Sequence, residues 1–193
     1  AATAGQPALT PTTAASGLPL APEQAAVTFD RAELSFRVDP SRKSLEGDAT
    51  LRFIARDALQ RLVVDLDRNY RIDLVEIDGR AIDAGHWRNP EGRMSVDLPA
   101  PLPAGGVATL RIRYTGSPHV ATRAPWDGGF VWATAPTGEP WIVTAVQGEG
   151  CDLLWPCIDH PRGEPREVVQ HVTVPSPLVA PGTGVAEGME EHT

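Results

Sequence analysis

Apolar and polar residues alternate along much of the chain, beginning near Val27. In the segment 31–39 the apolar positions are Ala32, Leu34, Phe36 and Val38, each flanked by polar or charged residues. The turn sequence DPSRKS follows, and the alternation then resumes over 45–55. Because successive side chains of a strand point to opposite faces, this pattern predicts an antiparallel pair of strands with one buried face.

Further segments repeat the pattern and predict more strands, at 61–67, 70–77, 93–99, 107–116, 130–135, 140–146 and 167–175. In one of them the alternation slips at Leu74–Val75, which indicates a bulge or a bend. No segment keeps a helical period over three turns. The sequence therefore predicts an all-β fold with little helix, built as a saddle-shaped, multi-sheet antiparallel β-sandwich.

The beginning of the chain has a different composition. Residues 1–24 are rich in Ala, Thr, Pro and Gly and carry a single charge, Glu23. Such a segment buries too little apolar surface to order itself. We therefore expect 1–25 to be a disordered or flexible spacer and 26–193 to be one β domain. The spacer resembles the segment that follows a removed export signal, so we expect a periplasmic or extracellular protein, with the cytoplasm as the alternative.

Charge and hydropathy exclude two kinds of partner. The formal net charge of −8 leaves no excess of Lys and Arg to neutralise phosphates, which argues against a nucleic-acid partner. No apolar run approaches the roughly 20 residues that a membrane-spanning helix needs. We therefore expect no nucleic acid and no membrane span.

The segment 144–165 holds both cysteines of the chain, Cys151 and Cys157, with Asp159 and His160 close behind. Structural zinc sites usually pair their ligands two to four positions apart, and no second pair is present, so we predict no metal site. A redox pair needs a C-x-x-C at a helix start, which is absent. We favour two free thiols in a loop that packs Trp155, although in an exported chain a disulfide between them is sterically conceivable.

No catalytic residue can be singled out. The chain contains neither G-x-S-x-G nor H-E-x-x-H, and Cys157 has no activating neighbour beyond the adjacent His160. Among the many Asp and Glu residues, nothing marks two as a catalytic pair. A self-contained hydrolase that uses carboxylates or Cys157 is therefore one rival hypothesis.

Three pieces, LSFRVDPSRKSLEGDATLRFIA, TAVQGEGCDLLWPCIDHPRGEP and REVVQHVTVPSPLVAPGTGVAEG, follow one another in a familiar order. Together they resemble the N-terminal domain of the aminopeptidase N-like zinc metallopeptidases, the gluzincin family that includes the leukotriene-hydrolysing enzymes. The family's L-x-G step is matched by Leu45-Glu46-Gly47 and its P-C-x-D-x-P run by residues 156–161. The resemblance extends over 27–188. It implies a saddle-shaped β domain that forms one wall of an active site built by the next domain.

In this family a Gln or Glu shortly before the P-C-x-D run binds the free α-amino group of the peptide. Alignment without gaps on Asp159 gives that role to Gln147, which we prefer. A shift of two residues gives it to Glu149, the second candidate. The alternative for both is that they only finish a strand and cap a Gly-rich turn. The family's Ala-Arg pair before the motif is Cys151-Asp152 here, which places close substrate contacts of that loop in question.

The resemblance thus implies the substrate-amine-binding domain of a zinc aminopeptidase, truncated at its C-terminal edge. Its partners would be the N-terminus of a peptide substrate and the catalytic domain of the same polypeptide, which would supply the zinc ligands. Because H-E-x-x-H is absent from these 193 residues, we predict that the chain alone binds no zinc and is inactive. The alternative is a stand-alone β-sandwich binding or adaptor module without catalysis.

Overall fold

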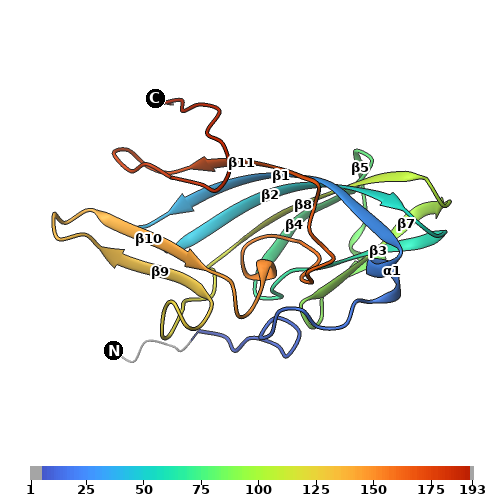
Figure 1. Ribbon diagram of the computed structural model, residues 1–193, viewed down its shortest axis with the longest axis horizontal. Coiled ribbons are helices and arrows are strands. Elements are labelled where there is room, and N and C mark those ends of the chain that lie inside the picture. Colours follow the sequence, from blue (N-terminus) through green and yellow to red (C-terminus); the bar gives the residue numbers. More distant parts are fainter. Residues whose placement is uncertain (1–5, 192–193) are drawn as a thin grey trace.

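The computed structural model describes residues 6–191 and consists of three β-sheets and short helical turns (Figure 1). The largest sheet has the strand order β11-β1-β2-β8-β4-β5. Its strands are β1 (Val27–Asp39), β2 (Ser44–Ala55), β4 (Arg71–Ile77), β5 (Arg80–Ala81), β8 (Val107–Gly116) and β11 (Glu167–Thr173). The prediction of an all-β fold made of several sheets is confirmed.

A second sheet of three strands has the order β3-β7-β6, and a hairpin makes a separate sheet of two strands. The bounds are β3 (Leu59–Asp65), β6 (Trp87–Arg88) and β7 (Arg93–Leu102) for the former, and β9 (Gly129–Thr134) and β10 (Pro140–Ala145) for the hairpin. The helical elements are α1 (Pro22–Ala25), η1 (Ala84–His86) and η2 (Cys151–Leu153). Every predicted strand segment overlaps an observed strand.

The core lies between the inner face of the six-stranded sheet and the three-stranded sheet. The central strands β1, β2 and β8 of the large sheet bury close to every second residue, as the alternation predicted, whereas the edge strand β11 buries none. On β2 the buried residues include Leu45, Leu51 and Phe53. The opposing layer contributes Val64 of β3 and Met94 of β7, both fully buried. This two-layer arrangement gives each amphipathic strand a partner for its apolar face.

The outer face of the large sheet is polar and carries rows of ion pairs. Arg111 on β8 reaches Asp48 on β2 at 2.7 Å and Glu76 on β4 at 3.2 Å. Cross-strand pairs of opposite charge of this kind stabilise neighbouring strands while keeping the face solvated. The pairing of the strands is antiparallel except for β11, which joins β1 in parallel.

The predicted irregularity in the segment 70–77 is present, slightly earlier than the sequence indicated. The register of β4 against β8 shifts between Ile72 and Leu74. The extra residue, Asp73, accepts a hydrogen bond from the hydroxyl of Thr115. A bulge here lets the inward-facing positions change from even to odd numbers, which explains the slip of the hydrophobic pattern.

The N-terminal arm, which we define as residues 6–21, differs from the expected flexible spacer. Its Thr13 is fully buried, and Thr10 donates a hydrogen bond of 2.7 Å to the carbonyl of Glu91. Gln24, directly after the arm, is buried and bonded to Asp65 at 2.7 Å. The composition argument counted apolar surface only, whereas this segment is held by hydrogen-bonded polar side chains. Residues 1–5 of the predicted spacer lie outside the described residues.

Within residues 6–191, none of the helices has the length and apolar character required to cross a membrane.

Candidate functional site

The loop of residues 146–166, which follows β10, carries both candidate residues and the P-C-x-D-x-P run. It is anchored at Cys157, which pairs with Asp65 at the end of β3 through two backbone hydrogen bonds of 2.7 and 2.9 Å. Cys157 is 1% exposed, so this point of the loop belongs to the core. The strand register of β3 therefore fixes where the loop turns.

Cys151 and Cys157 form a disulfide, so the favoured interpretation of two free thiols is wrong. The two residues are brought together because η2 turns the chain back on itself between them. The bond closes a short loop and holds one end of η2 to the core. It also removes the thiol that the rival hypothesis of a Cys157 nucleophile requires.

Two buried tyrosines support the loop from below. The hydroxyl of Tyr70 donates to the carbonyl of Leu153 at 2.8 Å, and that of Tyr114 donates to the carbonyl of Leu154 at 2.7 Å. The rings meet edge to face with centroids 5.0 Å apart. Burial raises the pKa of both hydroxyls well above the ordinary value, so both remain donors. Both tyrosines fall in segments that the sequence predicts as strands, 70–77 and 107–116, but nothing in the sequence identified them as supports of this loop.

Asp159 of the motif ties the loop together. Its carboxylate accepts a hydrogen bond from the hydroxyl of Ser16 at 2.9 Å, and its backbone N–H donates to Asp65 at 3.1 Å. It lies so close to Gly150 that a Cβ there would fall 2.2 Å from a carboxylate oxygen. Gly150 also has φ 123°, so only glycine fits at this position. The P-C-x-D spacing thus positions the turn that precedes η2.

Gln147 and Glu149 both lie in this turn, which the N–H of Gly150 closes by donating to the carbonyl of Val146 at 2.8 Å. The structure gives the two side chains different surroundings. Gln147 is exposed, whereas Glu149 is half-buried. The Oε2 atom of Glu149 packs against Gly128, where a Cβ would lie only 2.1 Å away. This buried oxygen has no hydrogen-bond partner among the described residues.

Four aspartates gather where the loop meets the end of β3: Asp65 and Asp67 after β3, and Asp152 and Asp159 in the loop itself. Arg93 neutralises Asp65 at 2.9 Å. Asp152 is fully buried, and in the described part of the chain neither of its carboxylate oxygens has a partner of normal hydrogen-bond geometry. Burial, and after it the negative charge of Asp159, raises the pKa of Asp152 to about 8. Across residues 6–191, no three His, Cys, Asp or Glu side chains are arranged to hold a metal ion.

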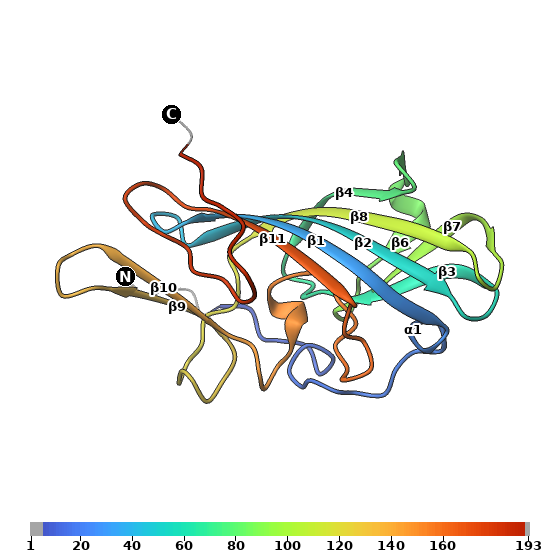
Figure 2. The same ribbon diagram turned by 45° about the horizontal axis from the view of Figure 1, so that its top comes forward.

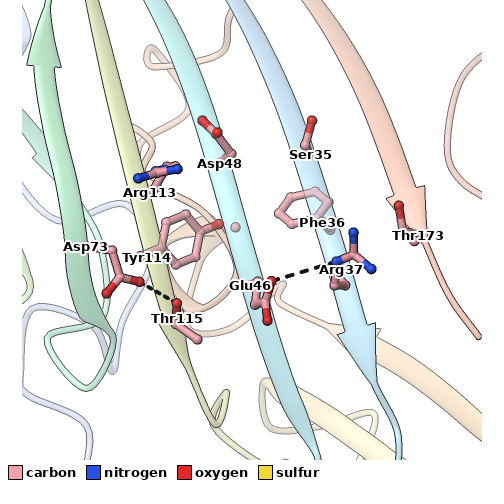
Figure 3. A pocket seen from close by; sticks show the side chains of 11 residues that line it. Ser35, Phe36, Arg37, Glu46, Asp48, Asp73, Arg113, Tyr114, Thr115 and Thr173 are labelled. Atoms are coloured by element: carbon pink, nitrogen blue, oxygen red, sulfur yellow. Dashed lines mark hydrogen bonds and ion pairs between the residues drawn. The ribbon is translucent and has the colours of Figure 1, made fainter.

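Among the described residues, two shallow hollows on the surface stand out, and the candidate residues line neither of these two. The larger, of about 420 Å³, lies on the polar face of the large sheet among Arg37, Asp48 and Arg113 (Figure 3). The other, of about 330 Å³, lies beside the disulfide, with Trp155 and Pro161 in its wall. The β9–β10 hairpin projects to one side of the two packed sheets, away from most of the other strands (Figures 1 and 2).

Neither a protein-family model nor a curated protein matches the chain. Solved structures do match it. An M1 zinc metallopeptidase from Deinococcus radiodurans superposes with a TM-score of 0.69 at 26% identity, over 93% of this chain and 39% of the other. A two-domain M1 zinc metallopeptidase bound to L-arginine also gives a TM-score of 0.69 at 26% identity, over 86% of this chain and 37% of the other.

A more distant match supports the fold alone. Yeast leukotriene A4 hydrolase in complex with bestatin has a TM-score of 0.61 at 17% identity, and 92% of this chain covers 27% of that enzyme. The fold and the loop therefore define a β domain of the kind found within larger metallopeptidases. The resemblance to the N-terminal domain of the aminopeptidase N-like, or M1, zinc metallopeptidases is confirmed, and the chain spans well under half the length of each of these matches.

Proposed function

We propose that this chain is the domain of a zinc aminopeptidase that binds the free α-amino group of a peptide substrate. The likeness to M1 zinc metallopeptidases supports this proposal, since one of them is bound to L-arginine and another to a Tyr-Ser-Ala substrate. In the full-length enzyme, zinc would polarise the scissile carbonyl and activate water. In this proposal the zinc ligands come from a further domain of the same polypeptide, and we predict that this chain alone is inactive.

The observation that carries the proposal is the unpaired oxygen of Glu149. A carboxylate oxygen that is buried without a partner is destabilising by about 1–3 kcal/mol, and a substrate ammonium would offset this by donating a charge-assisted hydrogen bond. Such a contact selects peptides with an unblocked N-terminus and sets the register of the scissile bond. The geometry therefore favours Glu149 as the amine ligand, with Gln147 as the second candidate.

The test uses the full-length enzyme and two single variants, Glu149→Ala and Gln147→Ala. If Glu149 binds the amine, its variant loses about 30-fold or more in kcat/KM on an amino-acid p-nitroanilide, because a buried charge partner is removed. Gln147→Ala then changes kcat/KM little. Glu139→Ala is the matched control, since Glu139 is an exposed carboxylate at the tip of the β9–β10 hairpin, which the turn with Glu149 follows.

The zinc content of each variant is measured alongside, so that loss of metal is not mistaken for loss of amine binding. If Gln147→Ala alone lowers kcat/KM, the amine role moves to Gln147. If both variants retain full kcat/KM, the amine-binding proposal is wrong for this domain. A stand-alone β-sandwich binding module then becomes the better account.

We also propose that the domain is exported. Disulfides persist in the periplasm and outside the cell, and they are rare in the reducing cytosol. The Cys151–Cys157 disulfide therefore supports an exported location. Thiol labelling in cells of the native host, followed by mass spectrometry of the 151–157 peptide, tests it. Complete labelling of both cysteines before reduction would contradict an oxidising compartment.

A further inference from the structure

The N-terminal arm contacts the base of the β9–β10 hairpin at two separate places. Near its start, Gln6 makes a two-way contact with Val120: its amide nitrogen donates to the carbonyl at 2.8 Å, and its amide oxygen accepts from the backbone N–H at 2.7 Å. Val120 in turn bridges to Phe130 at the start of β9. The arm thereby holds the loop segment that leads into the hairpin.

The second contact is also at the base of the hairpin, in the turn that follows β10. The backbone N–H of Ser16 donates to the carbonyl of Gly148 at 3.1 Å, and its hydroxyl donates to the carboxylate of Asp159 at 2.9 Å. The N–H of the next residue, Gly17, donates to the carbonyl of Asp159 at 3.2 Å. Gly148 stands immediately before Glu149. Ser16 therefore joins the turn that carries Glu149 to the aspartate of the P-C-x-D run.

These bonds act where the turn has few other supports. Gln147 and Gly148 are exposed, and the turn itself is closed by the single backbone bond from Gly150 to Val146. An exposed turn of this kind opens easily unless further bonds hold it. The hydroxyl of Ser16 bonds to a carboxylate, which is the stronger kind of hydrogen bond. Figures 1 and 2 show the arm, in dark blue, running beneath the orange loop in both views.

We infer that Ser16 is a positioning residue, which holds the 147–150 turn and with it the side chain of Glu149 in place for the substrate amine. The role in substrate binding rests on the proposed function, whereas the hold on the turn does not. A tethered carboxylate loses less freedom when an ammonium binds, so the contact would favour substrate binding without touching the reacting atoms.

The hold on the turn is tested in this chain by amide hydrogen exchange measured by NMR. Ser16→Ala removes the hydroxyl bond and is expected to speed exchange at Gly150 and Cys151 by about 3- to 10-fold, because the bond to the carboxylate is solvent-exposed and contributes no more than an ordinary hydrogen bond. Ser16→Thr keeps the hydroxyl and is expected to restore slow exchange. Ser41→Ala is the matched control, because it removes a Ser–Asp bond in a different turn, that of Asp39.

A chain that begins at Leu18 lacks both bonds of Ser16 and is expected to show a larger increase at the same two amides. Its near-ultraviolet circular dichroism, compared with that of the intact chain, reports whether the core remains folded. If exchange at Gly150 and Cys151 stays unchanged in Ser16→Ala and in the shortened chain, the inference is overturned.

The substrate role is tested in the full-length enzyme. Ser16→Ala is expected to raise KM about 3- to 10-fold with little change in kcat, and Ser16→Thr to recover the original KM. An unchanged KM overturns the positioning role. The outcome is separable from that of the proposed function: if Glu149→Ala has no effect on kcat/KM while Ser16→Ala still speeds amide exchange, the amine site fails and the hold on the turn stands.

Discussion

The ring of Tyr114 lies across Gly47, its register partner on the neighbouring strand. A Cβ at Gly47 would fall 2.1 Å from Cζ of the ring, so the absence of a side chain is what lets the ring cross β2 (Figure 3). The hydroxyl at the end of that ring donates to the carbonyl of Leu154 in the loop. The glycine of the L-x-G step and the P-C-x-D loop, far apart in sequence, are thus parts of one support.

Gly47→Ala is expected to destabilise the chain by about 1–3 kcal/mol or more, because the buried ring of Tyr114 has no space to move away from an added methyl group. The midpoint of urea denaturation measures this effect. Gly85→Ala is the control, since a Cβ there meets nothing within 4 Å. Equal midpoints for the two variants would contradict the close packing of Gly47 and Tyr114.

Tyr114→Phe removes the hydroxyl and keeps the ring, so it measures the contribution of the hydroxyl alone. The variant keeps the packing over Gly47 and leaves the carbonyl of Leu154 without its donor, which is expected to lower the free energy of unfolding by about 1–2 kcal/mol. Amide exchange in the loop after β10 is expected to rise more than exchange in β2. A uniform rise across both regions would indicate that the hydroxyl does not act on the loop in particular.

The strands were predictable because their buried faces follow a period of two, as on β2, where Leu45, Leu51 and Phe53 face inward. The bulge near Asp73 was visible as a slip in that same period. Sheet order was not predictable, since alternation tells which face is buried and not which strand lies alongside. The parallel pairing of β11 with β1 depends on the path of the loop between them, which no local pattern encodes.

The site was predictable to the extent that the motif located it. The turn with Gln147 and Glu149 was identified from its distance to Asp159, but the sequence could not distinguish an exposed side chain from a half-buried one. The disulfide was missed because spacing alone does not report whether η2 brings two cysteines together. Ser16 was missed because its partners are 132 and 143 residues away, at Gly148 and Asp159. The inward-facing hydroxyl of Tyr114 was a usable signal, since a buried tyrosine tip needs a partner.

Loss of the disulfide is expected to lower the free energy of unfolding by about 2 kcal/mol, the value for a short closed loop. The comparison is urea denaturation of the chain with and without a phosphine reductant at pH 7. Because Cys157 is buried, Cys151→Ala combined with Cys157→Ala is expected to cost somewhat more than reduction alone. The double variant has no disulfide, so its midpoint is expected to be the same with and without the reductant, which controls for other effects of the reductant. A midpoint that does not move on reduction would show that the bond contributes nothing to stability.

Gln24→Ala is expected to destabilise the chain by about 1–3 kcal/mol, because it removes a donor from the buried carboxylate of Asp65. The amide of Gln24 also accepts from the backbone N–H of Ala21 at 2.9 Å, so the start of α1 is expected to loosen. Gln170→Ala, on the exposed edge strand β11, is the matched control. Limited proteolysis within the N-terminal arm measures the loosening, and equal cleavage of the two variants would contradict it.

Asp152 gives the chain an unusual dependence on pH. Its pKa is raised from 3.8 to about 8 by burial first and by Asp159, Asp65 and Asp67, while the hydroxyl of Thr13 acts in the opposite direction. Between these two pH values the folded chain keeps a proton that the unfolded chain has lost. This group therefore makes the free energy of unfolding fall as pH rises, by up to about 1.4 kcal/mol per pH unit.

Asp152→Asn, which is neutral at every pH, is expected to remove that slope. At pH 5 the folded wild type is neutral at this position too, yet its unfolded state is already ionised, so Asp152→Asn is expected to be modestly the more stable form. The advantage is expected to grow towards pH 8, and urea denaturation at unit steps of pH measures it. Asp73→Asn is the contrasting control, because its hydrogen bonds with Arg71 and Thr115 lower the pKa of Asp73, and loss of that carboxylate is expected to destabilise at neutral pH. Parallel stability curves for wild type and Asp152→Asn would mean that Asp152 is ionised in the folded chain, and that the surroundings of the four clustered aspartates stabilise this charge.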